Sequence, residues 1–254
     1  MQFLRATRPL LIALVLSSCA SKATLDLTKT ETSQVRMDKT QMASDSLSVA
    51  LISPYKKKID DELSTIIGYS EQALDKATPE GLLGDFVADA CLAQAKELCA
   101  KKGYATPDLC FLNNGGLRNA LPNGNLTKKH IFELMPFENE LVMLEVPAAK
   151  VQLLAEFMAK KGGVPVSGIR MLIKNDKADS IEIAGKIYDG KTLVRVITSD
   201  YLAAGGDDLV FLAEIKEKYY LDVKVRDAIM NYIIDQKQAG KNIRVNFDGR
   251  IQKR

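Results

Sequence analysis

Apolar residues recur three and four positions apart in several stretches of the chain, and this spacing predicts helices. One helix is expected over 78–103, with Thr78-Pro79 at its start as N-cap and first-turn proline, and with Gly103 at its end. Further helices are expected over 128–134, where Thr127 is the candidate cap, over 147–163, and over 225–237.

Short runs of apolar and β-branched residues between these helices predict strands. The candidate strands cover 109–112, 141–146, 169–173, 180–184, 192–199 and 243–247. Helices and strands follow one another without a regular βαβ alternation. We therefore predict an α+β fold, with a mixed sheet and packed helices in a single domain over residues 51–254.

The N-terminus has the pattern of an export signal. Arg5 and Arg8 precede a short apolar stretch that ends in Leu16-Ser17-Ser18-Cys19, which resembles a bacterial lipobox. This pattern predicts a signal peptide over residues 1–18 and acylation of Cys19, which would anchor the chain to a membrane. A plain secretory signal with an incidental cysteine is the alternative. The expected location is the bacterial cell envelope, lipid-anchored and facing the periplasm or the cell surface.

Residues 19–50 are rich in Ser, Thr, Lys and Ala and have few apolar positions. A segment of this composition buries little surface, so we expect a flexible tether between the anchor and the domain. In the whole chain, 35 Lys and Arg residues are interspersed with 32 Asp and Glu residues, and the formal charge is only +3. This balance argues against a nucleic-acid partner.

Besides Cys19, the chain contains Cys91, Cys99 and Cys110. Cys91 and Cys99 fall on the same predicted helix, about 12 Å apart along its axis, which is too far for a disulfide. Cys110 could pair with either of them in an oxidising compartment, or all three could be buried as small apolar residues. No CxxC pair is present, so a structural zinc site is not expected.

The sequence has a single histidine, His130. A di-metal phosphatase site needs a cluster of His, Asp and Asn ligands, so we expect no catalytic residue, metal site or cofactor in this chain. The HExxH, GxxxxGK[ST] and GxSxG motifs are absent as well. We interpret His130 as a helix residue that is packed or partly exposed.

A glycine-rich loop follows the candidate strand 109–112. Its glycines, Gly115 and Gly116, allow the backbone to approach a ligand closely. Asn113 offers both a donor and an acceptor, and Arg118 offers a planar fork for phosphate or ribose oxygens. The loop is therefore a candidate binding loop for a sugar, base or phosphate.

A second glycine-rich loop, 201–208, follows the candidate strand 192–199. Tyr201 offers an aromatic face, Gly206 a tight turn, and Asp207 a carboxylate that can accept from ribose hydroxyls. Phe137, which lies between the two loops in sequence, offers a second ring. Two rings can enclose a base, and stacking is worth about 1–3 kcal/mol per base. The alternative is an ordinary turn with two core aromatic residues.

Taken in order, five motifs resemble the C-terminal domain of the 5′-nucleotidase and UDP-sugar hydrolase family. They are Gly84-Asp85 with Asp89-Ala90, the loop 113–118, Met135-Pro136-Phe137-Glu138-Asn139, the segment 198–207, and Asp248-Gly249-Arg250-Ile251. The resemblance covers residues 55–254 and implies the fold of that domain.

In this family, an N-terminal calcineurin-like metallophosphatase domain holds two metal ions, and the C-terminal domain holds the nucleoside. The resemblance implies that Phe137 and Tyr201 are the stacking pair. It also implies that Asn113 meets the base, that Arg118 lies near the sugar and phosphate, and that Asp207 accepts from the ribose. The chain departs from the family at Tyr201, where Phe is usual, and at Ala77, where an Arg often precedes the first helix.

The leading hypothesis is that this lipoprotein is the nucleoside- or nucleotide-binding part of a split 5′-nucleotidase in nucleotide catabolism. A separately encoded metallophosphatase, the expected partner, would supply divalent metal ions and the attacking water. A non-catalytic lipoprotein that captures nucleosides or nucleotide sugars is the second hypothesis. A scaffold with a purely structural role is the third.

Overall fold

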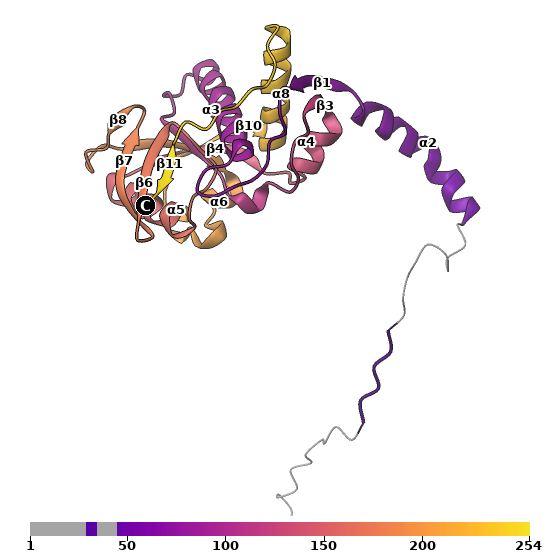
Figure 1. Ribbon diagram of the computed structural model, residues 1–254, viewed down its shortest axis with the longest axis horizontal. Helices are drawn as coiled ribbons and strands as arrows, with labels where there is room; N and C mark the ends of the chain where they lie inside the picture. The colour runs from indigo at the N-terminus through magenta and orange to yellow at the C-terminus, as the bar shows by residue number, and fades with distance from the viewer. Residues whose placement is uncertain (1–28, 35–44) are drawn as a thin grey trace, which may run out of the picture. The chain divides into compact units, whose positions relative to one another are not determined.

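The computed structural model describes residues 29–34 and 45–254 (Figure 1). The chain divides into two units between Leu51 and Ile52, and the buried core of the described residues lies entirely in the second unit. Cys19, the predicted signal peptide over 1–18 and most of the predicted tether lie outside the described residues.

Helix α2 (Ser46–Leu63) begins inside the segment that the composition predicts to be a tether. Residues 46–50 are therefore helical, and the bounds of the tether stay a prediction. The helix contains no buried residue, and it exposes six large apolar side chains: Leu47, Val49, Leu51, Ile52, Tyr55 and Ile59. Over the described part of the chain, no helix combines the length and apolar character needed to span a bilayer.

A five-stranded mixed sheet of order β10-β4-β9-β2-β5 forms the centre of the domain. Its strands are β2 (Leu109–Phe111), β4 (Glu140–Val146), β5 (Val166–Ser167), β9 (Val194–Ser199) and β10 (Lys218–Lys224). Strands β2 and β9 are parallel, and the other neighbours are antiparallel.

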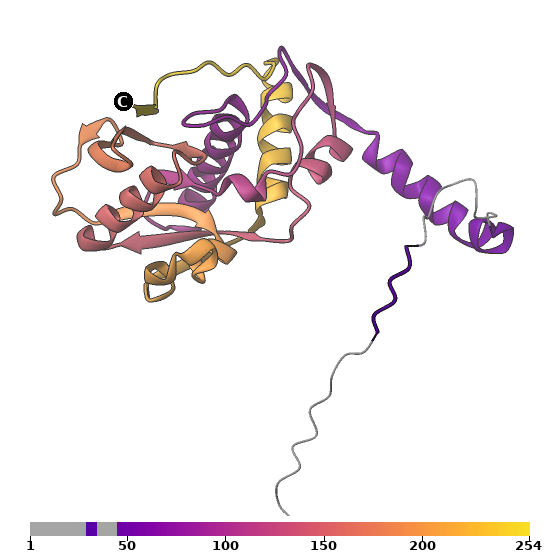
Figure 2. The same ribbon diagram turned by 60° about the horizontal axis from the view of Figure 1, so that its bottom comes forward.

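Both faces of this sheet are buried, which explains why the inner strands β2 and β4 contain continuous apolar runs. Along β4, Leu141 and Met143 belong to one hydrophobic cluster, and Val142 and Leu144 belong to the other. The first cluster includes helices α3 (Leu82–Lys102), α4 (Lys128–Leu134) and α8 (Val225–Gln238), and α3 and α8 lie side by side (Figures 1 and 2). The second includes α5 (Ala148–Lys160), α6 (Asp200–Ala203) and α7 (Val210–Ala213).

Two smaller sheets complete the domain. A four-stranded sheet has the order β11-β6-β7-β8, and a two-stranded sheet pairs β1 with β3. The hairpin between β6 and β7 turns through Asn175 and Asp176, which both have positive φ, a conformation that these residue types tolerate well. The bounds are β1 (Ile66–Ser70), β3 (Gly124–Thr127), β6 (Ile169–Lys174), β7 (Lys177–Ile183), β8 (Lys186–Ile187) and β11 (Ile251–Lys253).

Two predicted elements differ most from the structure. The helix predicted from Thr78-Pro79 begins at Leu82, with Gly81 as N-cap. The chain turns so tightly before this helix that a Cβ on Gly81 would lie 2.4 Å from the Ala77 nitrogen. The strand predicted over 243–247 is wrong, because in this segment only Ile243 forms an isolated bridge and the last strand is β11. The predicted helix end at Gly103 is confirmed.

Cys91, Cys99 and Cys110 are all buried and free, and Cys91 and Cys99 share α3 as predicted. Burial, with the neighbouring Cys91, raises the pKa of the Cys110 thiol well above its ordinary value. Of the two alternatives left open by the sequence, the structure shows the one with buried thiols.

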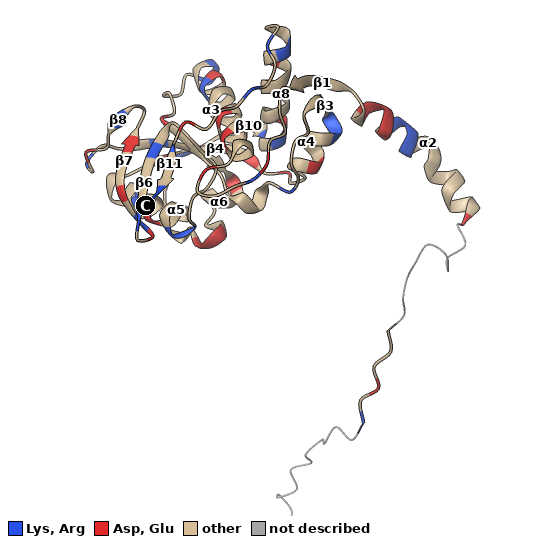
Figure 3. Ribbon diagram, viewed as in Figure 1, with Lys and Arg blue, Asp and Glu red and all other residues tan. Residues whose placement is uncertain are grey.

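Charged side chains of both signs are interspersed over the helices and strands of the domain (Figure 3). The distribution agrees with the small formal charge of the whole chain. The expectation that nucleic acid is not a partner stays a prediction.

A buried guanidinium joins two of the sequence motifs. Arg250 is only 8% exposed and donates to both oxygens of Asp89, at 2.8 and 3.1 Å, and to both oxygens of Asp248, at 3.1 and 3.2 Å. Its Nε also lies 3.5 Å from a carboxylate oxygen of Asp85, whose second oxygen is buried without a hydrogen-bond partner. The motifs around Asp85 and Arg250 thus tie the C-terminal segment to α3.

This network gives Asp85 an unusual titration. Burial, reinforced by Glu80, Asp89 and Asp248 and opposed by Arg250, raises the pKa of Asp85 to about 7 from its ordinary value of 3.8. Between these two pH values the folded protein keeps a proton that the unfolded chain releases. The contribution of Asp85 to the free energy of unfolding therefore falls as the pH rises through this window.

Asp85→Asn keeps the shape of the side chain and does not ionise. We expect this variant to unfold at a higher temperature than the wild type near pH 7.5 and to lose that advantage towards about pH 4. Thermal unfolding followed by circular dichroism at several pH values measures the difference. Asp179→Asn, at an exposed position, is the control and should show no such trend. Equal melting temperatures of Asp85→Asn and wild type near pH 7.5 would contradict the raised pKa.

Candidate functional site

Segments far apart in the sequence meet at one edge of the central sheet. Because β2 and β9 are parallel, their carboxyl ends lie at the same edge. Strand β4 runs antiparallel to β9, so its amino end lies there, and β10 runs antiparallel to β4, so its carboxyl end lies there too. The edge therefore collects the residues after β2, before β4, after β9 and after β10, a usual position for a ligand site in open sheets.

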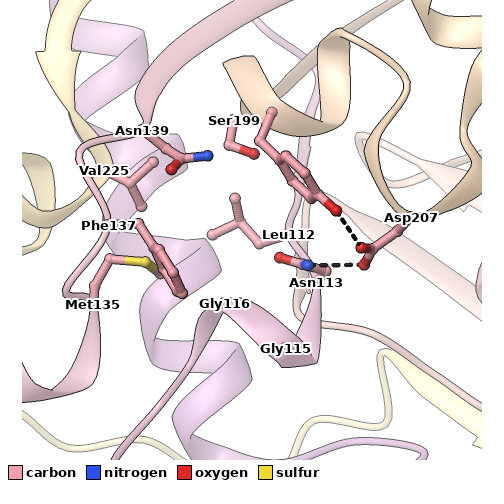
Figure 4. Close-up of a pocket in the computed structure, with 11 residues that line it drawn as sticks. Leu112, Asn113, Gly115, Gly116, Met135, Phe137, Asn139, Ser199, Asp207 and Val225 are labelled. Carbon is pink, nitrogen blue, oxygen red and sulfur yellow. Dashed lines mark hydrogen bonds between the residues drawn. The ribbon is translucent and has the colours of Figure 1, made fainter.

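A cavity of about 410 Å³ lies at this edge. Among the described residues that line it, only Asp207 carries a charge. Cavities of this size and largely apolar character typically bind small ligands with a flat apolar part. The lining consists of Leu112, Asn113, Gly115, Gly116, Met135, Phe137, Asn139, Ser199, Tyr201, Asp207 and Val225 (Figure 4).

The structure brings most of the predicted binding residues together. Six of the eight line this one cavity: Asn113, Gly115, Gly116, Phe137, Tyr201 and Asp207. Arg118 is exposed beside it, and its Nη1 donates to the carbonyl oxygen of Gly115 at 3.2 Å. Gly206 lies directly against the ring of Tyr201. That these residues contact a ligand stays a prediction.

Neither aromatic ring of the cavity is a core residue. Phe137 is 43% exposed and Tyr201 is 48% exposed. Phe137 lies on one side of the cavity and Asp207 on the other, with Leu112 and Asn113 between them (Figure 4). Tyr201 also lines the cavity, and its hydroxyl is hydrogen-bonded to Asp207. The alternative interpretation of two core aromatic residues is therefore wrong.

Two donors of the chain hold the carboxylate of Asp207 (Figure 4). The hydroxyl of Tyr201 donates to Oδ1 at 2.9 Å, and Nδ2 of Asn113 donates to Oδ2 at 2.8 Å. The bond to Asp207 raises the pKa of the Tyr201 hydroxyl, because the neutral phenol is the donor. The backbone of Asp207 is left-handed, with φ 55° and ψ 32°. Asp207 therefore lies in a tight turn, and its side chain lines the cavity.

Two glycines make room for these side chains. A Cβ on Gly116 would lie 2.9 Å from Oδ1 of Asn113, and a Cβ on Gly206 would lie 2.5 Å from the ring of Tyr201. Both distances are shorter than a van der Waals contact. The glycines of the two loops therefore position Asn113 and Tyr201.

Gly206→Ala is expected to lower the free energy of unfolding by about 1–3 kcal/mol, because the ring of Tyr201 has to shift. Gly115→Ala is the matched control, since its Cβ would find no atom nearer than 3.6 Å. We expect the control to cost less than about 1 kcal/mol. Urea unfolding compares the two variants, and equal losses of stability would contradict the packing argument.

The segment that carries Phe137 is fastened to the start of α8. The carboxylate of Glu138 accepts hydrogen bonds from Lys224 and from Nη2 of Arg226, and these bonds lower the pKa of Glu138 to about 2. The next residue, Asn139, accepts a backbone hydrogen bond of 2.8 Å from the first residue of α8. The two residues that follow Phe137 are thus fixed, which limits the movement of its ring.

Sequence reasoning missed five lining residues: Leu112, Met135, Asn139, Ser199 and Val225. Leu112 adjoins the loop 113–118. Met135 and Asn139 belong to the motif 135–139, and Ser199 belongs to the segment 198–207, but the motifs alone did not indicate that these residues line a cavity. Val225 belongs to no motif. It reaches the cavity only because β10 pairs with β4.

Within the described residues, no group of three or more His, Cys, Asp and Glu side chains is arranged to hold a metal ion. His130 has a structural partner instead. The backbone N–H of Thr127 donates to Nδ1 of His130 at 3.1 Å, at the start of α4. The interpretation of His130 as a helix residue is confirmed, since its burial is intermediate and it belongs to α4.

The strand order and the lined cavity define a class of protein: a mixed α/β domain with a cavity of small-ligand size at the strand ends. Comparison with known families then gives the family. The sequence model described as "5′-nucleotidase, C-terminal domain" matches residues 64–214, and the chain belongs to this family. The predicted family is confirmed.

Individual relatives are distant and longer than this chain. The trifunctional nucleotide phosphoesterase protein YfkN of Bacillus subtilis is 25% identical over 222 residues, which cover 78% of this chain and 14% of that protein. A 5′-nucleotidase of Vibrio cholerae is 24% identical over 177 residues, which cover 66% of this chain and 30% of that protein.

The fold is shared with solved structures. The crystal structure of a 5′-nucleotidase precursor from Thermus thermophilus matches with a TM-score of 0.68 and 20% identity, over 82% of this chain and 43% of that chain. The predicted α+β fold is confirmed by this similarity. The chain spans less than half the length of each of these three relatives.

Proposed function

We propose that this chain binds the nucleoside part of a nucleotide between Phe137 and Tyr201, in nucleotide catabolism. The observation that carries the proposal is the arrangement of two exposed rings with Asn113 and Asp207 around one cavity of about 410 Å³. Exposed rings that line a cavity gain stacking energy when a flat heterocycle enters. Membership in the 5′-nucleotidase family supports the same ligand class.

The residues of the cavity have distinct roles in this proposal. Phe137 and Tyr201 hold the base by stacking, Asn113 faces its polar edge, and Asp207 faces the sugar. Arg118, at the exposed rim, directs its remaining guanidinium donors towards the phosphate. Holding a phosphate ester in one orientation removes part of the entropic barrier to its hydrolysis, which is worth several kcal/mol.

We further propose that hydrolysis is supplied by a separately encoded metallophosphatase, which brings divalent metal ions and the attacking water. The test is to purify the full chain together with a candidate metallophosphatase from the same genome and to measure phosphate release from AMP with divalent metal present. The complex should hydrolyse AMP faster than either protein alone. Failure of the two proteins to associate, or to hydrolyse any nucleotide, would contradict the split enzyme.

The proposed location is the bacterial cell envelope, through acylation of Cys19. The sequence pattern around Cys19 supports it. Metabolic labelling with a palmitate analogue should mark the wild-type chain and leave Cys19→Ser unmarked. Equal labelling of both, or of neither, would contradict acylation at this residue.

A capture protein for free nucleosides is the second candidate function. The observation that favours it is the charge of the cavity, whose described lining carries the anion Asp207 and no cation. Such a lining suits an uncharged nucleoside better than a phosphate ester. Calorimetry with adenosine, uridine and AMP distinguishes the two functions, because a capture protein should bind adenosine more tightly than AMP and should do so without a phosphatase.

A further inference from the structure

The hydroxyl of Tyr201 changes the chemistry of the cavity. A phenylalanine at this position would offer the same ring face and leave Asp207 without its Tyr201 partner. Here Tyr201 donates to Oδ1 of Asp207 at 2.9 Å and Asn113 donates to Oδ2 at 2.8 Å. Each oxygen of the carboxylate therefore already has a donor from the chain itself.

The position of the hydroxyl is fixed by more than one contact. The ring of Tyr201 lies so close to Gly206 that a Cβ there would be 2.5 Å away. The hydrogen bond to Asp207 then holds the far end of the ring, and the left-handed turn at Asp207 holds the carboxylate. The Tyr201–Asp207 contact is thus part of the cavity wall.

Asp207 is the charged acceptor of the described lining, so it is the strongest partner for the hydroxyls of a sugar. A carboxylate has about four acceptor positions, and two of them are already used. An additional donor shares the charge of an oxygen that already accepts a hydrogen bond, and it gains less than it would from a free oxygen. A ribose 2′-hydroxyl therefore adds little to the affinity.

We propose that Tyr201 determines the sugar specificity of this cavity: with its hydroxyl on Asp207, the site binds 2′-deoxyribonucleosides nearly as tightly as ribonucleosides. The inference rests on the proposed function, because it assumes that a nucleoside occupies the cavity. Tyr201 has two roles here, since its ring stacks on the base while its hydroxyl satisfies the carboxylate that would otherwise select ribose.

The test is calorimetry of the full chain with adenosine and with 2′-deoxyadenosine. For the wild type, we expect the two dissociation constants to differ by less than about threefold. Tyr201→Phe frees one oxygen of Asp207 and should raise the preference for adenosine to about tenfold, the usual effect of one hydrogen bond to a charged group. Tyr69→Phe, at an exposed tyrosine outside the cavity, is the control and should keep the wild-type ratio.

The outcomes separate this inference from the proposed function. A wild type that prefers adenosine tenfold, or a Tyr201→Phe variant that keeps the wild-type ratio, would overturn the role of Tyr201 and leave nucleoside binding intact. A wild type that binds neither compound would contradict the proposed function and the inference with it. Thermal unfolding of Tyr201→Phe should match the wild type closely, because the ring remains in place.

Discussion

Phe137→Ala is expected to weaken the binding of adenosine by roughly 5- to 150-fold, because stacking on one aromatic ring contributes about 1–3 kcal/mol. The ring of Phe137 is 43% exposed and lines the cavity, so its removal takes away a face for the base without opening a hole in the core. The free energy of unfolding should therefore change little. Isothermal titration calorimetry measures the affinity, and chemical unfolding measures the stability.

Phe247→Ala is the matched control for this variant. Phe247 is also exposed, at 62%, but it does not line the cavity. We expect the control to bind adenosine as the wild type does. If Phe137→Ala and Phe247→Ala bind equally well, the ring of Phe137 has no part in ligand binding and the stacking arrangement is contradicted.

Arg250→Met is expected to have the largest effect on stability, a loss of about 3–5 kcal/mol in the free energy of unfolding. Methionine fills most of the space but leaves Asp85, Asp89 and Asp248 without their shared cation. The buried pair of this network is Arg250 with Asp85, whose side chains are 10% and 4% exposed, and removing one partner of a buried pair is costly because the other stays desolvated. For a domain of this size, the melting temperature should fall by roughly 6–20 °C.

Arg170→Met provides the control for the loss of a cation. The side chain of Arg170 is about half exposed, at 49%, although it also lies near Asp248. Exposed ion pairs contribute about 0–1 kcal/mol, so the melting temperature should change by only a few degrees. Similar melting temperatures for the two variants would mean that the buried network of Arg250 does not stabilise the domain.

Strands β2, β4 and β9 of the central sheet and its main helices could be predicted from local sequence, whereas β5 and β10 of the same sheet were not predicted. Strand β4 contains the continuous apolar run 141–144 and β9 is rich in β-branched residues, and each strand contributes to both clusters of the core. The end of α3 at Gly103 follows from its left-handed conformation, which glycine adopts without strain. These features depend on local sequence and on burial, and the spacing of apolar residues along the chain indicates both.

Features that depend on long-range pairing could not be predicted in the same way. Apolar and polar residues alternate in the segment 243–247 as they do in a strand. In the structure, however, the segment pairs with a neighbouring strand only through the isolated bridge at Ile243. Strands β1 and β3 were not predicted, since each is short and is stabilised by the other. The start of α3 is set by a tight backbone turn at Gly81. Gly81 has no capping side chain, so the sequence contains no local signal for this helix start.

The candidate site shows the same division. The order of the motifs was enough to predict that Asn113, Phe137, Tyr201 and Asp207 come together, and the structure places them around one cavity. The hydrogen bonds that Asp207 accepts from Asn113 and Tyr201 could not be predicted, because they require β2 and β9 to be parallel neighbours. The contribution of Val225 depends likewise on the pairing of β10 with β4.

A crystal structure of the chain grown with adenosine would test nucleoside binding most directly. We predict that the purine lies between the rings of Phe137 and Tyr201, with its sugar directed towards Asp207. A purine bound elsewhere on the domain, or an empty cavity at saturating adenosine, would contradict the account.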